Sequence, residues 1–274
     1  MQVINRELNQ NHRGATTTHL FDFAFLPDLS GLLQKIAEIA VNENWGQNHE
    51  YLLRYCRDNF EIAHAQAKVT MDENKQFAVW RVGYLVSADG TPIYVIFEKN
   101  RVHGKQPFYL RTVYKTSQDR IPCRSNGNPA VYIPRPDEPE YEIPEYRPDF
   151  NVEFNWHHYE EQRSRLPKAL QAIENDRAAY LCIFGAVTLS HRLHKAGARI
   201  AVPQYYRGAY EYLLPLCMTH DDHNSRPDLV AGLQEDRQGK TYFVKTLLLP
   251  EMAYPHARAV ATSTAHIRSW LQDP

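Results

Sequence analysis

The densest group of side chains that could do chemistry lies in the second half of the chain. Arg192, Lys195 and Arg199 are three and four residues apart, so they would share one face if a helix continued through them. Such cations can bind phosphate oxygens, while Gln204 and Tyr205 could position and stack on a base. The pattern therefore predicts a phosphate- or nucleotide-binding site. The alternative is a solvated helix end, where positive charge complements the helix dipole.

A second candidate follows the short apolar alternation that ends at Phe154. Asn155 and His158 stand at the end of this predicted strand or loop, where polar side chains can face a cleft. Imidazole acts as a general acid or base near neutral pH, so we expect His158 to have that role, with Asn155 and Arg192 in the catalytic set. The alternative is a pair of ordinary surface or hydrogen-bonded histidines.

Near the C-terminus, Arg258 falls on a predicted helix. It could bind a ligand anion, or it could form a buried ion pair that fixes the helix to the sheet. His191 and His194, and the run His220-Asp221-Asp222-His223, are only local pairs of possible ligands. We therefore predict no metal site and no cofactor. The sequence has no G-x-S-x-G, P-loop, G-x-G-x-x-G or H-E-x-x-H motif, which disfavours the commonest hydrolase, NTPase, dinucleotide and zincin mechanisms.

Charge is unevenly distributed, although the formal net charge is only -1. Residues 99–124 carry seven cations and one acid, and residues 137–161 carry nine acids and one cation, Arg147, with Arg135 just before them. The first segment suggests a positive surface that could meet phosphates. The alternative is that the two segments pack together and neutralise each other.

These features give three functional hypotheses. The preferred one is a metal-independent enzyme acting on RNA or nucleotides, such as a nuclease or nucleotide hydrolase. The second is a non-catalytic RNA-binding or regulatory module that uses the basic segment and nearby aromatics. The third is a scaffold protein that binds a protein partner through a segment rich in Pro, Glu and Tyr, residues 122–148.

The periodicity of the apolar residues predicts an α+β fold, with two antiparallel β-meanders packed with N-terminal, central and C-terminal helices. Helical spacing predicts helices after Asp28 and over 49–60, and from Leu166 to about Lys195 either two helices or one bent at Gly185. A last helix is expected from Tyr254 to about Val260. We find no internal repeat in the sequence. The predicted strands are Phe77–Val86, Ile93–Phe97 and Phe108–Tyr114, then Tyr210–Met218, Asp228–Glu235 and Lys240–Leu249.

We expect a flexible arm at residues 1–19 and a single domain over 20–274, interrupted by the connector at about 122–148. The 274 residues show no apolar run long enough to span a membrane and no secretory signal, so we expect a cytoplasmic protein. The four cysteines form no C-x-x-C pair and are expected to be reduced and mostly buried.

Six short blocks resemble, in the same order, the bacterial family of domain of unknown function 3825. They are Leu20–Ala24, Pro92–Asn100, Ala201–Tyr206, Leu213–Leu216, Met252–Arg258 and Trp270-Leu271. The specific blocks are Pro203-Gln204-Tyr205-Tyr206 and Met252-Ala253-Tyr254, and the resemblance extends from Leu20 to Leu271. Some members of this family are joined to small nucleic-acid-binding domains such as cold-shock-like folds, which implies an RNA or nucleotide context. The matching polar set is Asn155, His158, Arg192, Lys195, Gln204, Tyr205 and Arg258.

The sequence also departs from the family pattern. Members carry Asn-Thr-Gly-Leu in the strand before the Asp-Gly hairpin, where this chain has Trp80-Arg81-Val82-Gly83-Tyr84-Leu85. A family asparagine corresponds to His256. If the strand asparagine is functional in relatives, this chain has changed its specificity or lost the activity.

Overall fold

The structure is a computed structural model of the chain. It describes residues 19–125, 127–198, 200–206, 208–222, 224–261 and 267–271. Apart from His19, the predicted N-terminal arm lies outside the described residues. In the described part, no helix combines the length and apolar character needed to cross a bilayer.

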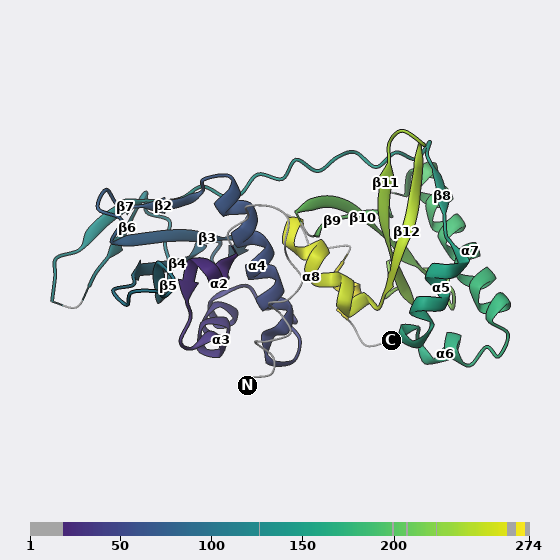
Figure 1. Cartoon of the computed structure of the whole chain (residues 1–274), viewed down its shortest axis with the longest axis horizontal. Coiled ribbons are helices and arrows are strands. Elements are labelled where there is room, and N and C mark those ends of the chain that lie inside the picture. Colours follow the sequence, from purple (N-terminus) through teal and green to yellow (C-terminus); the bar gives the residue numbers. More distant parts are fainter. Residues whose placement is uncertain are drawn as a thin grey trace.

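The N-terminal half is a five-stranded sheet with helices on one face (Figure 1). Its elements are α2 (Leu20–Phe23), β1 (Ala24–Phe25), α3 (Leu29–Ile39), η1 (Gln47–His49), α4 (Glu50–Ala65), β2 (Val69–Met71), β3 (Phe77–Val86), β4 (Pro92–Lys99) and β5 (Phe108–Lys115). The strand order is β1-β5-β4-β3-β2. Strands β3 to β5 form the predicted antiparallel meander, β2 adds a fourth antiparallel strand that was not predicted, and β1 pairs in parallel with β5.

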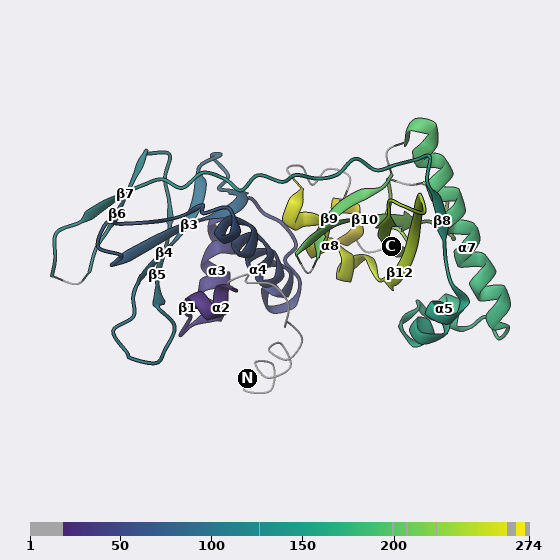
Figure 2. The ribbon, with the colours of Figure 1, turned by 45° about the horizontal axis from the view of Figure 1, so that its top comes forward.

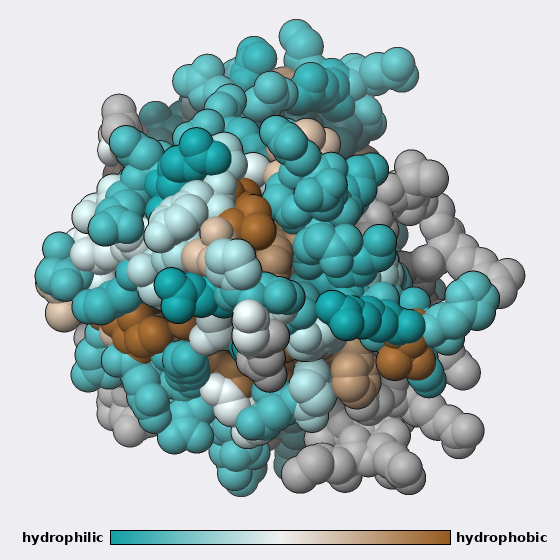
Figure 3. All heavy atoms as spheres, turned by 90° about the vertical axis from the view of Figure 1, so that its left-hand side faces the viewer, coloured by the Kyte–Doolittle hydropathy of each residue, from teal (hydrophilic) through white to brown (hydrophobic). Residues whose placement is uncertain are grey.

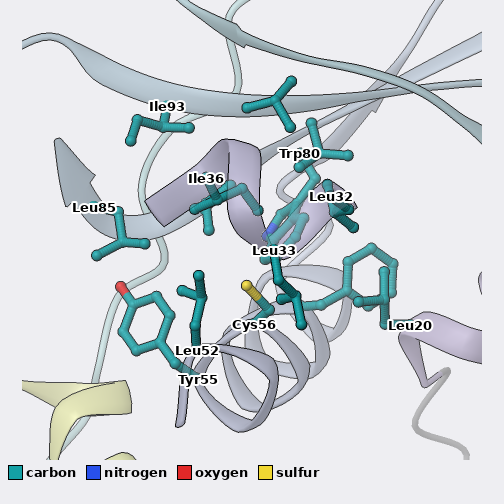
Figure 4. Packing of buried hydrophobic residues seen from close by; sticks show 14 of the residues in the cluster. Leu20, Leu32, Leu33, Ile36, Leu52, Tyr55, Cys56, Trp80, Leu85 and Ile93 are labelled. Carbon is teal, nitrogen blue, oxygen red and sulfur yellow. The ribbon is translucent and has the colours of Figure 1, made fainter. Parts of the chain in front are cut away.

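The helices of this half form as their sequences predict. Asp28 caps α3, because its side chain accepts a hydrogen bond of 2.8 Å from the backbone N–H of Gly31. The apolar faces of α3 and α4 then pack against the sheet, where Trp80 is among the largest buried side chains (Figure 4). This packing covers one face of the sheet and forms the core of the N-terminal half.

A β-hairpin covers part of the other face of this sheet. It consists of β6 (Arg120–Cys123) and β7 (Val131–Pro134), and its inward side chains Ile121, Cys123 and Ile133 are buried against strands β3 and β4. The connector predicted at about 122–148 therefore begins inside a hairpin, and only its later part runs extended between the two halves. Proline is tolerated here because each strand of a two-stranded sheet is an edge strand.

The C-terminal half contains a second five-stranded sheet (Figure 1). Its elements are β8 (Asn151–Glu153), α5 (Trp156–Gln162), η2 (Arg163–Arg165), α6 (Lys168–Gln171), α7 (Asp176–Leu193), η3 (His194–Ala198), β9 (Val202–Tyr206), β10 (Ala209–Leu216), β11 (Leu229–Asp236), β12 (Thr241–Leu248), α8 (Pro250–Val260) and η4 (Arg268–Leu271). Of the two arrangements predicted for the central region, two consecutive helices are present, and α7 runs through Gly185 as one helix.

The two halves share one topology. The second sheet has the order β8-β12-β11-β10-β9, in which an edge strand precedes the helices and pairs in parallel with the last strand of a four-stranded meander. The first sheet is built in the same way. The two meanders and the α+β class are as predicted, whereas the duplicated topology has no counterpart in a visible sequence repeat.

Helices α4 and α8 pack against each other between the two sheets. Helix α8 covers the face of the second sheet that α7 leaves open, with Ala253, Tyr254 and Ala257 buried there. Each sheet also has its own large hydrophobic cluster. The prediction of one domain over residues 20–274 stays a prediction.

Candidate functional site

Asn155 and His158 lie beside a cavity of about 460 Å³ in the C-terminal half. Asn155 is the N-cap of α5, where its side chain accepts a hydrogen bond of 2.9 Å from the backbone N–H of His157. The Nδ1 atom of His158 lies 3.4 Å from a carboxylate oxygen of Glu161. The cavity is also lined by Lys245, so it combines an imidazole, an amide and an ammonium group.

Arg192 and Lys195 lie elsewhere, at the end of α7. Helix α7 ends at Leu193 and continues as η3 (His194–Ala198), in which Gly197 has a φ of 101°, so the helical conformation breaks before residue 199. Arg199 lies outside the described residues.

The histidines beside these cations have partners within the chain. His191 Nδ1 lies 2.7 Å from the hydroxyl of Tyr146, and His194 Nδ1 accepts a hydrogen bond of 2.9 Å from the backbone N–H of Ala201. Burial lowers the pKa of His191, and the positive charge of Lys195 lowers it further. Both imidazoles therefore tie the end of α7 to neighbouring segments.

Gln204 and Tyr205 are inside the protein, on β9. They are 3% and 7% exposed, respectively. Tyr205 packs against Ile62 of α4 and Val260 of α8, and burial, reinforced by the nearby carboxylate of Glu61, raises its pKa to about 12. The structure thus places Tyr205 at the contact between the halves and Gln204 beside Glu211 of the second sheet, and neither lines the cavity beside His158.

Arg258 forms a buried ion pair, the second of the two alternatives considered for it. Its Nε atom donates to Glu43 at 2.9 Å, and both side chains are at most one-tenth exposed. Its guanidinium lies 5.1 Å from the ring centroid of Tyr55. Since Glu43 follows α3 and Arg258 is on α8, the pair joins the two halves.

Strand β3 approaches α4 closely beside this ion pair, at Tyr55 and Asn59. In β3, the register with β4 shifts between Arg81 and Val86, and Gly83 has a φ of 52°. The Gly83 backbone lies against Asn59 and the hydroxyl of Tyr55, which accepts a hydrogen bond of 2.9 Å from the Tyr84 backbone N–H. The close approach of the β3 backbone to Asn59 and Tyr55 gives a physical reason for a glycine at position 83.

Basic residues surround a second hollow, on the N-terminal half. It has a volume of about 320 Å³, and its lining residues are Ile96, Arg111, Thr112, Pro122, Arg124 and Tyr132. We call it the basic hollow. Strand β4 pairs Ile96 with Thr112 and Phe97 with Leu110, so Arg111 is the extra residue of a β-bulge. Bulges reorient side chains, which accounts for Arg111 and its neighbour Thr112 both lining the hollow.

The contacts around the basic hollow come from three segments. Glu98 Oε2 lies 3.6 Å from Arg111 Nε, and Glu98 Oε1 accepts a hydrogen bond of 2.7 Å from the hydroxyl of Ser125. Tyr132 is 54% exposed, and its carbonyl accepts hydrogen bonds from Arg120. Tyr132 was missed in the sequence, although Val131-Tyr132-Ile133 alternates as an edge strand would.

The acidic segment does not neutralise this surface through the ion pairs that the structure describes. Glu138 pairs with Arg81 at 2.6 Å, and Glu140 pairs with Lys68 at 2.8 Å. The ion pairs of the basic segment instead involve residues outside the acidic segment, such as Asp89 with Lys115 at 3.2 Å. Of the two arrangements considered for these segments, the described pairs favour a separate positive surface.

Comparison with known proteins identifies a family but no characterised relative. No curated protein and no solved structure matches the chain. A family model does match, and it covers residues 36–267. The match includes both sheets except strand β1, and therefore most of the chain. The chain therefore belongs to the family described as domain of unknown function DUF3825.

Proposed function

We propose that this protein binds single-stranded RNA through the basic hollow. The observation that carries the proposal is the grouping of Arg111, Arg124 and the exposed ring of Tyr132 around one concave surface. Guanidinium groups bind phosphate oxygens through two parallel hydrogen bonds, and an exposed aromatic ring offers a stacking surface for a base.

The shape of the hollow supports an unpaired nucleotide as the ligand. Its volume of about 320 Å³ is at the lower end of small-ligand sites, which span roughly 300–1,000 Å³. Ile96 and Pro122 add apolar surface beside the two arginines. A base inside a duplex cannot stack on a side chain, so Tyr132 favours single strands. Figure 3 views this end of the molecule, which is largely hydrophilic with separate apolar patches.

Binding of labelled single-stranded RNA tests this proposal. The double variant Arg111→Gln/Arg124→Gln should weaken binding at least tenfold at low salt. If both arginines contact phosphates, the plot of the logarithm of the association constant against the logarithm of the salt concentration should become less steep. Its slope should decrease in magnitude by about 1.4, since each phosphate contact contributes about 0.7 for single strands. Tyr132→Ala should cost about 1–3 kcal/mol of binding free energy with little change in that slope.

The matched control removes two arginines from the other half of the protein. Arg147 and Arg237 are both more than half exposed, and each pairs with a nearby carboxylate. Arg147→Gln/Arg237→Gln should leave affinity and salt slope close to the wild-type values. Equal losses in the two double variants would indicate non-specific charge attraction and would remove the hollow from the proposal.

A metal-independent enzyme acting on RNA or nucleotides is the second candidate, because Asn155, His158 and Lys245 line one cavity. His158 would act as general acid or base, and Lys245 would stabilise phosphate charge. Incubating the protein with RNA and free nucleotides in the presence of a chelator should then yield product. His158→Ala should abolish turnover and leave RNA affinity unchanged, whereas the same rate in wild type and variant would exclude His158 from the reaction.

A further inference from the structure

Helix α7 has apolar residues on two opposite faces. The inner face packs on the second sheet through Ala179, Ile183 and Val187. On the outer face, Leu181 and Leu189 are 54% and 47% exposed. Figure 2 shows α7 along the outer edge of the molecule, with the second sheet on its inner side. A helix that is apolar all round is normally covered on both sides, so the outer face points to a partner.

The outer residues form one stripe along the helix. Successive residues are about 100° apart, so Leu181, Gly185 and Leu189, at intervals of four, lie within about 40° of a common line. Ala178 and Cys182 are exposed and extend the same line. We call these five residues the α7 stripe. Gly185 lies at the centre of the stripe, and one leucine lies four positions to each side of it.

Gly185 is not explained by contacts within the chain. A Cβ atom placed there would have no atom within 4 Å, and the residue is helical. Glycine inside a helix costs roughly 1 kcal/mol relative to alanine. A residue that weakens the helix and relieves no clash within the chain fits a position where a second helix approaches closely from outside.

We propose that the α7 stripe is the contact between two copies of this chain, whose α7 helices cross in antiparallel orientation at Gly185. A two-fold axis through this point places Leu181 of one copy against Leu189 of the other, twice, with glycine facing glycine. The spacing of the stripe is thus complementary to itself. Absence of side chains at the crossing allows the helix axes to approach to about 8 Å, the close end of helix packing.

The charged residues favour the antiparallel orientation. Glu174 precedes α7, whereas Arg192 and Lys195 are at its other end, and all three are exposed. Antiparallel pairing brings Glu174 of one chain near Lys195 of the second. Parallel pairing would instead place each charged residue beside the same residue of the second chain, so that like charges would meet. Arg177 lies about 80° around the helix from the stripe and so projects to its side. Because the basic hollow is at the opposite end of the molecule, a dimer would keep both hollows exposed (Figure 1).

Sedimentation of the full chain at tens of micromolar tests the dimer. We expect a mass of two chains for the wild type and of one chain for Leu181→Glu, with unchanged thermal stability of the fold. Val102→Glu is the matched control, since Val102 is 60% exposed in the other half and should leave the dimer intact. A monomeric wild type, or a dimer that Leu181→Glu does not dissociate, would overturn the proposal.

Disulfide trapping tests the orientation. Gly185→Cys in a Cys182→Ser background should form a covalent dimer under mild oxidation, because residue 185 of one chain faces residue 185 of the second chain. Thr188→Cys should be linked to the native Cys182 of the second copy, since the Cα atoms of a disulfide lie within about 7 Å. Arg237→Cys, on the β11–β12 turn, should stay monomeric on the same gel. Native Cys182 linked to Cys182 would indicate parallel helices and overturn the antiparallel crossing.

Discussion

Replacing Arg258 with methionine should lower the free energy of unfolding by about 3–5 kcal/mol, the range typical of removing one partner from a buried ion pair. The Glu43 side chain is only 10% exposed, and without Arg258 it would keep the hydroxyl of Tyr254 as its described hydrogen-bond partner. The variant also loses the guanidinium that packs over the rings of Tyr55 and Trp45. Urea denaturation followed by tryptophan fluorescence measures the change.

Two further variants separate the ion pair from general disturbance of α8. In Glu43→Gln/Arg258→Met the uncompensated charge is gone, so the double variant should be more stable than Arg258→Met alone. Arg237→Met removes one partner of the pair with Glu235, in which the arginine is 73% exposed, and should cost less than 1 kcal/mol. A loss at Arg258 as small as that at Arg237 would mean that the buried pair adds little to the contact between the halves.

Local patterns predicted much of the fold because the elements that they describe are long. The alternating strands around Asp89-Gly90 form the hairpin of β3 and β4, with Gly90 at a φ of 76° as such turns require. Strands β1, β2, β6, β7 and β9 were missed. They have only two to five residues, too few for a clear alternation of apolar and polar residues, and β1 is fixed by pairing with the distant strand β5.

The candidate site was less predictable, because spacing along a helix does not reveal which elements meet. Arg192 and Arg258 carry the same charge, yet Arg192 is exposed at the end of α7 and Arg258 is buried against Glu43. In contrast, Arg111 and Arg124 come from a segment whose positive charge is contiguous in the sequence, so a basic surface could be expected there. What the sequence did not reveal was the bulge at Arg111 or the position of Tyr132 beside it.

Substituting Gly83 with alanine should destabilise the protein by about 3 kcal/mol, through a clash and an unfavourable backbone conformation together. The added Cβ would lie 2.3 Å from Asn59 Oδ1 and 2.5 Å from the hydroxyl of Tyr55. Neither atom can move freely, since Asn59 is fully buried and its amide donates to the carbonyl of Ala259 at 3.2 Å. Displacing Asn59 would also break this link between α4 and α8.

Gly90→Ala separates the two contributions. Gly90 also has a positive φ, but a Cβ atom there would meet nothing within 4 Å, so only the backbone cost of about 1 kcal/mol should remain. The difference between the two alanine variants in urea denaturation therefore measures the close approach of β3 to α4. Equal losses would show that Asn59 and Tyr55 move aside without cost, and Gly83 would then serve the backbone conformation alone.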